Sequence, residues 1–376
     1  MTFFVHMDGQ RWVIESRGFV ATGGCGVVAR AKCDGKPDIV VKILREDRHA
    51  SAENELRFLR ALSASPPGCS NLLAALAADV MLIESEDSGG KSCCTCSAGA
   101  DFGIGNVEIG AARNFEDRAK QDAPGNDGQT SRFGEEDECV SDDAECHRIC
   151  PESLAGLRCF AFPRAQMCLF DAVARGCDFV DADTVALGVA RGLSHMLDLN
   201  FVHLDVKTEN VLIRSIPCNC LSVQDVVLCD YGGTILLPVL APASGEAVCK
   251  AGHDGRGKLG SLTPGSSPLE AFDGRVSRKS DVFSLGILFH NVLSNLYLFD
   301  CYGSQREYRE CVRELNVSAE AFHGLCPRDC RLILECVREN CTERPSMAFL
   351  VEEFERRLSS PSQNGPSQNE RNADGK

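Results

Sequence analysis

The stretch FVHLDVKTENVLI, residues 201–213, holds three polar side chains of different chemistry between two apolar flanks. Burying such groups costs free energy unless each has a partner or a use, so the stretch restricts what the chain can fold into. Asp205 can accept a proton from a hydroxyl group, Lys207 offers a cation suited to a phosphate, and Asn210 offers a carbonyl oxygen that suits Mg²⁺. Together they predict a site for phosphate chemistry.

A carboxylate follows in a similar setting at VVLCDYGG, residues 226–233. Asp230 stands after an apolar strand and before two glycines, where it would be the main carboxylate ligand of a metal ion. Phosphoryl transfer needs a phosphate cradle, a fixed lysine, metal ions and a proton acceptor. The two stretches would supply the ligands of the metal ions and the proton acceptor.

The N-terminal part of the chain offers candidates for the other two parts. The segment VATGGCGVV contains Gly23, Gly24 and Gly26, and glycines let backbone N–H groups approach a phosphate closely. A glycine-rich hairpin turn would have the same sequence. Lys42 lies inside the apolar strand VVKIL, where it needs a partner unless it faces solvent. Glu55, on the next predicted helix, could hold its ammonium group.

Periodicity separates predicted strands from predicted helices along the chain. Alternating apolar residues predict strands at 19–31 and 38–44. Apolar residues at helical spacing, with Asp or Ser near several of the starts, predict helices further along. These helices are expected at 50–62, 181–199, 280–299, 330–340 and 349–358.

The segment 84–153 differs from the rest in composition. It has 17 Asp and Glu against 6 Lys and Arg, so it carries −11 of the net charge of −15. Low hydrophobicity with high charge cannot offset chain entropy, so we expect disorder here. The negative charge also argues against a nucleic-acid backbone or an anionic membrane as a partner, because both would be repelled.

Cysteine is abundant, with 22 residues in the chain. The first residues lack the pattern of a signal peptide, and no apolar stretch is long enough to span a bilayer. We therefore expect reduced thiols, no disulfides and a cytoplasmic or nuclear location. The densest group of cysteines lies between 93 and 150. A zinc site there is the alternative, but no CxxC pair has a second pair at finger spacing.

In this order along the chain, the motifs resemble those of eukaryotic-type protein kinases. Asp230-Tyr231-Gly232 corresponds to the family's D-F-G, PLE at 268–270 corresponds to A-P-E, and the glycine-rich loop corresponds to 21–28. The resemblance implies catalytic roles for Asp205 and Lys207. It implies nucleotide binding by Ala21, Gly23, Gly24, Gly26, Val28, Lys42 and Glu55, metal binding by Asn210 and Asp230, and structural or substrate-aligning roles for Glu209, Thr263, Glu270, Asp281 and Arg344.

The resemblance also implies a fold and an activity. The fold would be α+β with two lobes, a small β-rich N-lobe and a larger helical C-lobe. The expected bounds are 10–83 and 154–163 for the N-lobe, 84–153 for an acidic insert, 164–358 for the C-lobe and 359–376 for a disordered tail. The activity would be ATP- and Mg²⁺-dependent transfer of the γ-phosphate to Ser or Thr hydroxyls of proteins. Lys207 in the catalytic loop is similar to the Ser/Thr class rather than the tyrosine class.

Two positions depart from the family pattern and leave alternatives open. Ala21 replaces the first glycine of the loop, which would cost nucleotide affinity. Leu204 replaces an arginine that contacts a phosphorylated activation loop, so the mode of activation is in doubt while the chemistry is intact. A pseudokinase that acts as a binding scaffold is the main alternative, and a small-molecule kinase with a related core is another.

Two narrower expectations rest on short stretches. The KTEN loop and CFAFPRAQMCLFDAV, residues 159–173, are similar to the herpesvirus Ser/Thr protein kinases, which implies a host-cell location. Glu209 directly precedes Asn210, and in kinases with a Glu at this position its carboxylate often faces a basic substrate residue. A preference for Arg two or three residues before the target hydroxyl is therefore expected.

Overall fold

The computed structural model of the chain describes residues in both predicted lobes. The described residues are 2–7, 10–15, 19–23, 26–44, 49–66, 69–80, 83–85, 158–217, 220–238, 249–250, 262–299, 305–314 and 321–359. The predicted acidic insert beyond Ser85 and the predicted tail beyond Ser359 lie outside them. So do Gly24 and most of the segment between Leu237 and Thr263.

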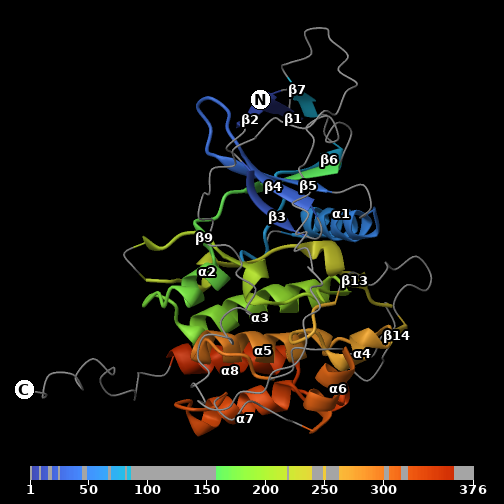
Figure 1. Ribbon diagram of the computed structural model, residues 1–376, viewed down its shortest axis with the longest axis vertical. Coiled ribbons are helices and arrows are strands. Elements are labelled where there is room, and N and C mark those ends of the chain that lie inside the picture. The colour runs from blue at the N-terminus through green and yellow to red at the C-terminus, as the bar shows by residue number, and fades with distance from the viewer. Residues whose placement is uncertain are drawn as a thin grey trace, which may run out of the picture.

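A five-stranded antiparallel sheet forms the centre of the N-lobe. Its strand order is β3 (Phe19–Gly23), β4 (Gly26–Ala31), β5 (Ile39–Leu44), β8 (Arg158–Pro163) and β6 (Ala77–Val80). Helix α1 (His49–Ala64) packs beside this sheet (Figure 1). In the register of the sheet, Lys42 pairs with Val28 on one side and Phe160 on the other. The predicted strand Lys therefore lies in the middle of the sheet.

A second, three-stranded sheet covers part of the N-lobe core. Its order is β2 (Gln10–Glu15), β1 (Thr2–Met7) and β7 (Ile83–Ser85). Val5, Trp12 and Ile14 from this sheet are buried in one cluster with Val41 and Ile43 of β5. Strand pairing thus begins before residue 10 and continues past residue 83, the two bounds expected for the first part of the N-lobe.

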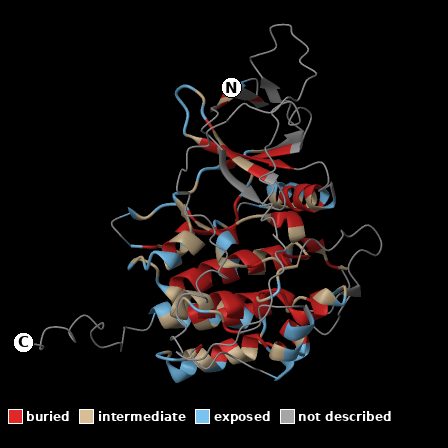
Figure 2. Ribbon diagram, in the orientation of Figure 1, coloured by how far each residue is buried: buried red, intermediate tan, exposed pale blue. Residues whose placement is uncertain are grey.

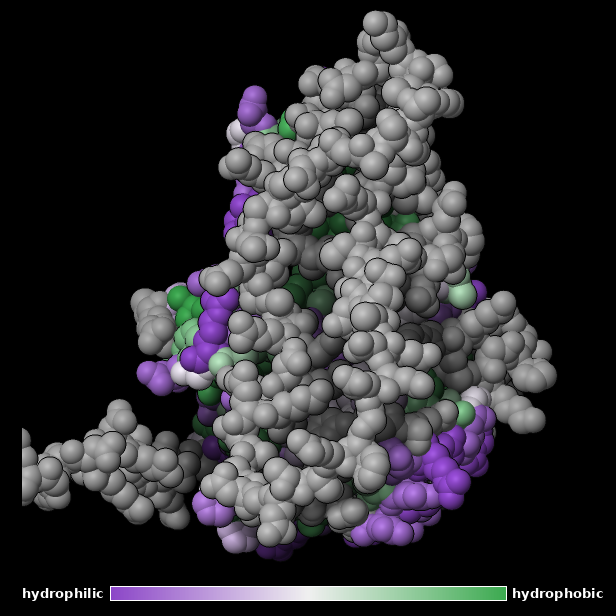
Figure 3. All heavy atoms as spheres, in the orientation of Figure 1, coloured by the Kyte–Doolittle hydropathy of each residue, from purple (hydrophilic) through white to green (hydrophobic). Residues whose placement is uncertain are grey.

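Helices dominate the C-lobe, which forms the lower half of the molecule in Figure 1. They are α2 (Leu169–Ala174), α3 (Ala182–Asp198), α4 (Leu269–Phe272), α5 (Ser280–Ser294), α6 (Gln305–Glu314), α7 (Pro327–Cys336) and α8 (Met347–Ser359). Helices α3 and α5 are buried along most of their length, as Figure 2 shows. Helix α6 instead presents charged residues to solvent and contributes to the hydrophilic patch at the lower right of Figure 3.

Local signals explain where these helices begin and end. Asp181 caps α3, because its side chain accepts a hydrogen bond from the Thr184 N–H. Helix α5 ends at Ser294, although a helix was predicted through 299. Asn295 takes a left-handed conformation with φ of 54°, which terminates the helix. The prediction was wrong over these last residues because apolar spacing continues past the helix end.

Short strands place the polar loops between the lobes. Strands β12 (Val226–Leu228), β11 (Val211–Ile213) and β9 (Met167–Cys168) form one small sheet, and β10 (Phe201–Val202) pairs with β13 (Ile235–Leu236). Further along, β14 (Cys249–Lys250) pairs with β15 (Arg275–Val276). The loop that carries Asp205 follows β10, and the loop that carries Asp230 follows β12. The pairing of these short strands places the two loops next to each other.

The structure confirms the predicted α+β fold of two lobes. Strands dominate the N-terminal part and helices the C-terminal part (Figure 1). The lobes also meet through the segment after α1, since Leu73 N–H donates to Leu228 O and Leu228 N–H donates to Asn71 O. Among the described residues no helix is both long and apolar enough to cross a membrane.

Candidate active site

Lys42 lies between two carboxylates at the junction of the lobes. Its Nζ is 2.8 Å from Glu55 Oε2 and 2.7 Å from Asp230 Oδ1. Lys42 comes from β5, Glu55 from α1 and Asp230 from the loop after β12. Burial alone would lower the pKa of Lys42, but the two carboxylates outweigh it and raise the pKa above the ordinary value. The ammonium group is therefore held charged at any physiological pH.

The two carboxylates that hold Lys42 differ in their own protonation. Burial would raise the pKa of Asp230, but the Lys42 ammonium outweighs burial and lowers this pKa to about 2. Glu55 is fully buried, and burial raises its pKa despite the same ammonium. Asp230 is thus the firmly ionised member of the pair. Its backbone has a left-handed φ of 61°, which is uncommon for a residue other than glycine.

Three polar residues of the loop between β10 and β11 form hydrogen bonds with one another and with Thr263, which precedes α4. Asp205 Oδ1 is 3.0 Å from Lys207 Nζ and accepts a hydrogen bond from Thr263 Oγ1 at 3.1 Å. Lys207 Nζ also donates to Thr263 Oγ1 at 3.3 Å. Asn210 Nδ2 donates to Asp205 Oδ2 and to Asp205 O, both at 2.8 Å. The structure thus brings Asp205, Lys207, Asn210 and Thr263 together.

Buried side chains hold this loop from below. Asp281, at the start of α5, accepts hydrogen bonds from the His203 and Leu204 N–H groups at 2.7 and 2.8 Å. His203 is buried and accepts from the Asp205 N–H at 3.3 Å. Leu204 is 1% exposed and has a φ of 66°, a strained value for a side chain with a Cβ. Asp281 therefore fixes the loop backbone that presents Asp205.

A buried ion pair lies further into the C-lobe. Arg344 donates from both terminal nitrogens to the two carboxylate oxygens of Glu270, at 2.7 and 2.9 Å. Ser280 Oγ donates to the same carboxylate at 3.0 Å, and the guanidinium lies 5.1 Å from the Phe283 ring. Such a bidentate pair, with its remaining donors bound to backbone carbonyls, joins α4, α5 and the loop before α8.

The glycine-rich loop lies at the turn between β3 and β4. Ala21 pairs with Val28, and Gly23 pairs with Gly26, across this hairpin. Val28 is in turn the neighbour of Lys42 in the sheet. Gly23 and Gly26 therefore lie in the same sheet as Lys42. A cradle for phosphates is expected at this position.

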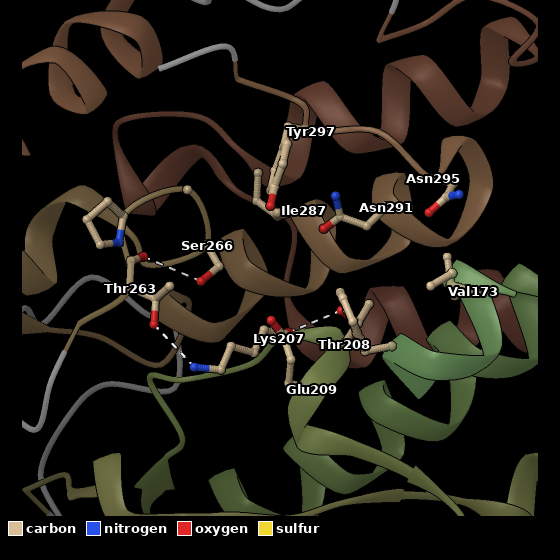
Figure 4. A pocket seen from close by; sticks show the side chains of 14 residues that line it. Val173, Lys207, Thr208, Glu209, Thr263, Ser266, Ile287, Asn291, Asn295 and Tyr297 are labelled. Carbon is tan, nitrogen blue, oxygen red and sulfur yellow. Dashed lines mark hydrogen bonds between the residues drawn. The ribbon is translucent and has the colours of Figure 1, made fainter. Parts of the chain in front are cut away.

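A small pocket opens on the C-lobe beside the catalytic loop, and Figure 4 shows its lining. Its volume is about 150 Å³. Glu209 is an exposed residue on its wall, and Thr208 Oγ1 donates to the Glu209 carboxylate at 3.2 Å. On the opposite wall, Asn291 Nδ2 donates to Leu296 O at 2.7 Å, which leaves its Oδ1 as an acceptor. The lining residues are Phe170, Val173, Ala174, Lys207, Thr208, Glu209, Thr263, Pro264, Gly265, Ser266, Ile287, Asn291, Asn295 and Tyr297.

Two buried polar residues near Lys42 were not predicted. Asn54 is 2% exposed and Thr234 is 1% exposed, and the two are joined by a hydrogen bond. The only signal in the sequence was that Asn54 directly precedes Glu55 on the buried face of a predicted helix. Nothing in the sequence pairs it with a residue 180 positions away.

The fold and this geometry are those expected of a protein kinase domain, and comparison with known proteins finds the same similarity. Residues 174–354 match the family described as protein tyrosine and serine/threonine kinase. The match covers nearly the whole helical lobe, including Asp205, Asn210 and Asp230. The helical lobe of the chain, just under half of its length, is therefore similar to protein kinase domains of the eukaryotic type. The family includes both tyrosine and serine/threonine kinases, so the match leaves the substrate hydroxyl undecided.

Individual relatives are distant and much longer. The chain is 27% identical to ephrin type-A receptor 3 of Danio rerio over 184 residues, which cover 46% of this chain and 16% of that protein. It is 28% identical to a probable LRR receptor-like serine/threonine-protein kinase of Arabidopsis thaliana over 189 residues, 46% of this chain and 18% of that protein. The similarity thus spans less than a fifth of each relative.

Proposed function

We propose that this protein transfers the γ-phosphate of ATP to Ser or Thr hydroxyls of protein substrates. The observation that carries the proposal is the position of Lys42 between Glu55 and Asp230, beside the Asp205 and Asn210 loop. An ammonium group fixed at the lobe junction is suited to bind the phosphates of a nucleotide. The kinase family match supports the reaction class.

Asp205 is the group that would accept the proton of the substrate hydroxyl. The hydroxyl oxygen attacks the γ-phosphorus, the bond from that phosphorus to the bridging oxygen breaks, and ADP leaves. Lys207 lies 3.0 Å from Asp205 and would stabilise charge on the transferred phosphate. Burial would lower the pKa of Lys207, but Asp205 outweighs burial and raises it, so this cation persists through the reaction.

Asp230 and Asn210 are suited to Mg²⁺. Asp230 Oδ1 is occupied by Lys42, while among the described residues no hydrogen bond reaches its Oδ2. Asn210 uses its Nδ2 for Asp205, which leaves its Oδ1 as a neutral oxygen donor. Carboxylate and amide oxygens fit a hard cation that completes its shell with phosphates and water. Bound Mg²⁺ would neutralise charge on the phosphates.

The Ser/Thr assignment rests on Lys207 and Thr263. These side chains share Asp205 Oδ1 and bond to each other, so they bracket the position of an incoming hydroxyl. Both residues are similar to the Ser/Thr class of the family. Phosphoamino-acid analysis of a labelled mixed substrate would separate phosphoserine and phosphothreonine from phosphotyrosine. A label only on tyrosine would reject the assignment.

The pocket beside Glu209 supports a preference for arginine in the substrate. Its two facing walls offer the Glu209 carboxylate and the Asn291 carbonyl oxygen, both of which accept hydrogen bonds. A guanidinium group has five N–H donors in one plane and suits two such acceptors. We therefore extend the proposal to peptides with Arg two or three residues before the target hydroxyl.

The proposal also includes a narrower type and a location. The KTEN loop and residues 159–173 are similar to herpesvirus Ser/Thr kinases, which supports a viral kinase that acts in the cytoplasm or nucleus of a host cell. Imaging of a tagged full chain in cells tests the location. Accumulation at a membrane would contradict it.

Phosphate transfer with radiolabelled ATP tests the activity itself. We expect wild type to label a basic Ser/Thr peptide and Asp205→Asn to abolish labelling, because amide nitrogen and oxygen cannot accept the proton. Asp225→Asn is the matched control: Asp225 is 7% exposed, accepts a hydrogen bond from Ser215 and lies directly before β12. No labelling by folded wild type would support the pseudokinase alternative.

A further inference from the structure

One face of helix α1 contacts the segment that begins with Asp230. Ser51, Asn54, Glu55 and Phe58 have the spacing that aligns side chains on one side of a helix. Each of the four meets the segment 230–234, through steric contact, hydrogen bonds, a shared ion pair or ring packing. The same face of α1 also carries Glu55, which pairs with Lys42.

Two hydrogen bonds join α1 directly to this segment. Asn54 Nδ2 donates to Gly232 O at 3.2 Å, and Thr234 Oγ1 donates to Asn54 O at 3.3 Å. Thr234 Oγ1 also donates to Tyr231 O at 2.9 Å. Asn54 and Thr234 are both nearly fully buried. A buried polar group that loses its partner is destabilising, so either side chain opposes separation of the helix from the segment.

Packing on either side of these bonds brings the helix close. A Cβ atom at Gly232 would collide with the Ser51 hydroxyl and lie 3.4 Å from Ser51 Cβ, so glycine permits this approach. Two helical turns further along α1, the Phe58 ring lies 4.5 Å from the Tyr231 ring. Tyr231 is anchored by its hydroxyl, which donates to Leu228 O at 2.7 Å and to Leu73 O at 3.2 Å.

These contacts determine how far apart the two partners of Lys42 lie. Glu55 directly follows Asn54, and Asp230 lies two residues before Gly232. A fixed distance between Asn54 and Gly232 therefore fixes the distance between the two carboxylates that hold Lys42. Meanwhile Leu204 is apolar and buried, so it offers no charge to a phosphate on the activation segment.

We infer that Asn54 and Thr234 are positioning residues that lock α1 against the segment 230–234, so that the Lys42 ion pairs form without a phosphate on the activation segment. The inference rests on the proposed kinase function and adds a mode of regulation to it. Activity is then a property of the unmodified chain.

Kinetics on phosphatase-treated protein test the lock. Thr234→Val removes the hydroxyl without changing the side-chain shape, and we expect kcat to fall about 10- to 100-fold, since a small misplacement of reacting groups costs that much. Thr234→Ser keeps the hydroxyl and should keep the wild-type kcat. Asn54→Ala should resemble Thr234→Val. In each variant the KM for the peptide should change little, because the peptide side of the site is untouched.

Asn71→Ala is the matched control for lost stability. Asn71 is 3% exposed and its side chain also donates two hydrogen bonds, to Val223 O and Val226 O, but it does not bond the segment 230–234. This variant should lower the melting temperature while kcat stays at the wild-type value. Unchanged kcat in folded Thr234→Val and Asn54→Ala would overturn the inference. So would loss of wild-type activity on phosphatase treatment.

Hydrogen exchange separates this inference from the proposed function. Amides of α1 should exchange faster in Asn54→Ala and Thr234→Val than in wild type or Asn71→Ala, with α3 and α5 unchanged. This readout needs no catalysis. If wild type transfers no phosphate while α1 loosens as expected, the proposed function fails and the lock stands. Unchanged α1 exchange in both variants would reject the lock whatever the activity.

Discussion

At the scale of single residues, Lys42 shows how electrostatics and burial combine. Its ammonium is the shared cation partner of the fully buried Glu55 and of Asp230. Removal of the charge leaves two carboxylates close together in a site that disfavours charge. The carboxylate with the raised pKa, Glu55, is the one that would take up a proton first.

The first prediction follows for Lys42→Met. We expect phosphate transfer to be lost and the melting temperature to fall at pH 7. The deficit relative to wild type should shrink as the pH falls toward 5, because protonation of Glu55 relieves the repulsion between carboxylates. In wild type the Asp230 pKa of about 2 lies below its unfolded value, so its contribution is present above pH 4 and lost only below that. Thermal unfolding across pH measures this.

Lys36→Met, at an exposed position, is the control for loss of one positive charge. Its melting temperature should follow that of wild type at every pH. A Lys42→Met deficit that stays constant from pH 7 to 5 would show that the carboxylates do not carry the effect.

Glu209 carries the second prediction at this scale. Its replacement, Glu209→Gln, should weaken the preference for Arg before the target hydroxyl, because a charged bidentate partner becomes a neutral one. The measurement is a positional scan of peptides, with kcat/KM for each. Glu352→Gln, at an exposed position on α8, changes the net charge equally and should keep the preference. A flat scan in wild type, or an unchanged one in Glu209→Gln, contradicts the role.

At the scale of elements, the C-lobe is joined by an ion network around Arg357 of α8. Its side chain is 4% exposed and contacts Asp183 of α3, Asp329 of α7 and Glu353 of α8. Burial would raise the pKa of Glu353, but the surrounding arginines lower it to about 2. The Arg357 guanidinium therefore links helices α3, α7 and α8.

The third prediction is that Arg357→Met destabilises the C-lobe. Three carboxylates would lose their shared cation, and breaking a buried pair typically costs about 3–5 kcal/mol. Urea unfolding should show a lower midpoint, while kcat at low temperature stays unchanged because the network lies away from Asp205. Because the Glu353 pKa is lowered, the loss should be present above pH 5 and diminish as the pH falls toward 2. Arg331→Met, exposed on α7, should leave the midpoint unchanged.

The same scale shows what the sequence could and could not predict. Helices α1, α3, α5, α7 and α8 were predictable because apolar residues recur at helical spacing, and the site followed from motif order. The strands Thr2–Met7 and Ile83–Ser85 were not assigned, since short apolar runs do not identify their partners. The bond between Asn54 and Thr234 joins distant segments, and only the folded chain brings them together.

At the scale of the whole molecule, charge is distributed unevenly along the chain. The segment 84–153 carries −11 of the net −15, so the two lobes are nearly neutral. Strand β7 leads into it and β8 follows it, and both strands pair within the N-lobe. The segment thus enters and leaves on the N-lobe, while the predicted peptide pocket lies on the C-lobe.

The last prediction concerns replacement of residues 86–153 by a Gly/Ser linker. We expect the melting temperature and kcat to match wild type, because the composition predicts no core of its own and loop closure depends weakly on length. The kcat/KM for an arginine-containing peptide should fall at low salt only, since loss of a net charge of −10 weakens attraction that salt screens within about 8–10 Å. A linker of the same length that carries the same net charge of −10 as residues 86–153 should restore kcat/KM. Loss of folding or kcat in both linkers would instead mean that the segment packs on the lobes.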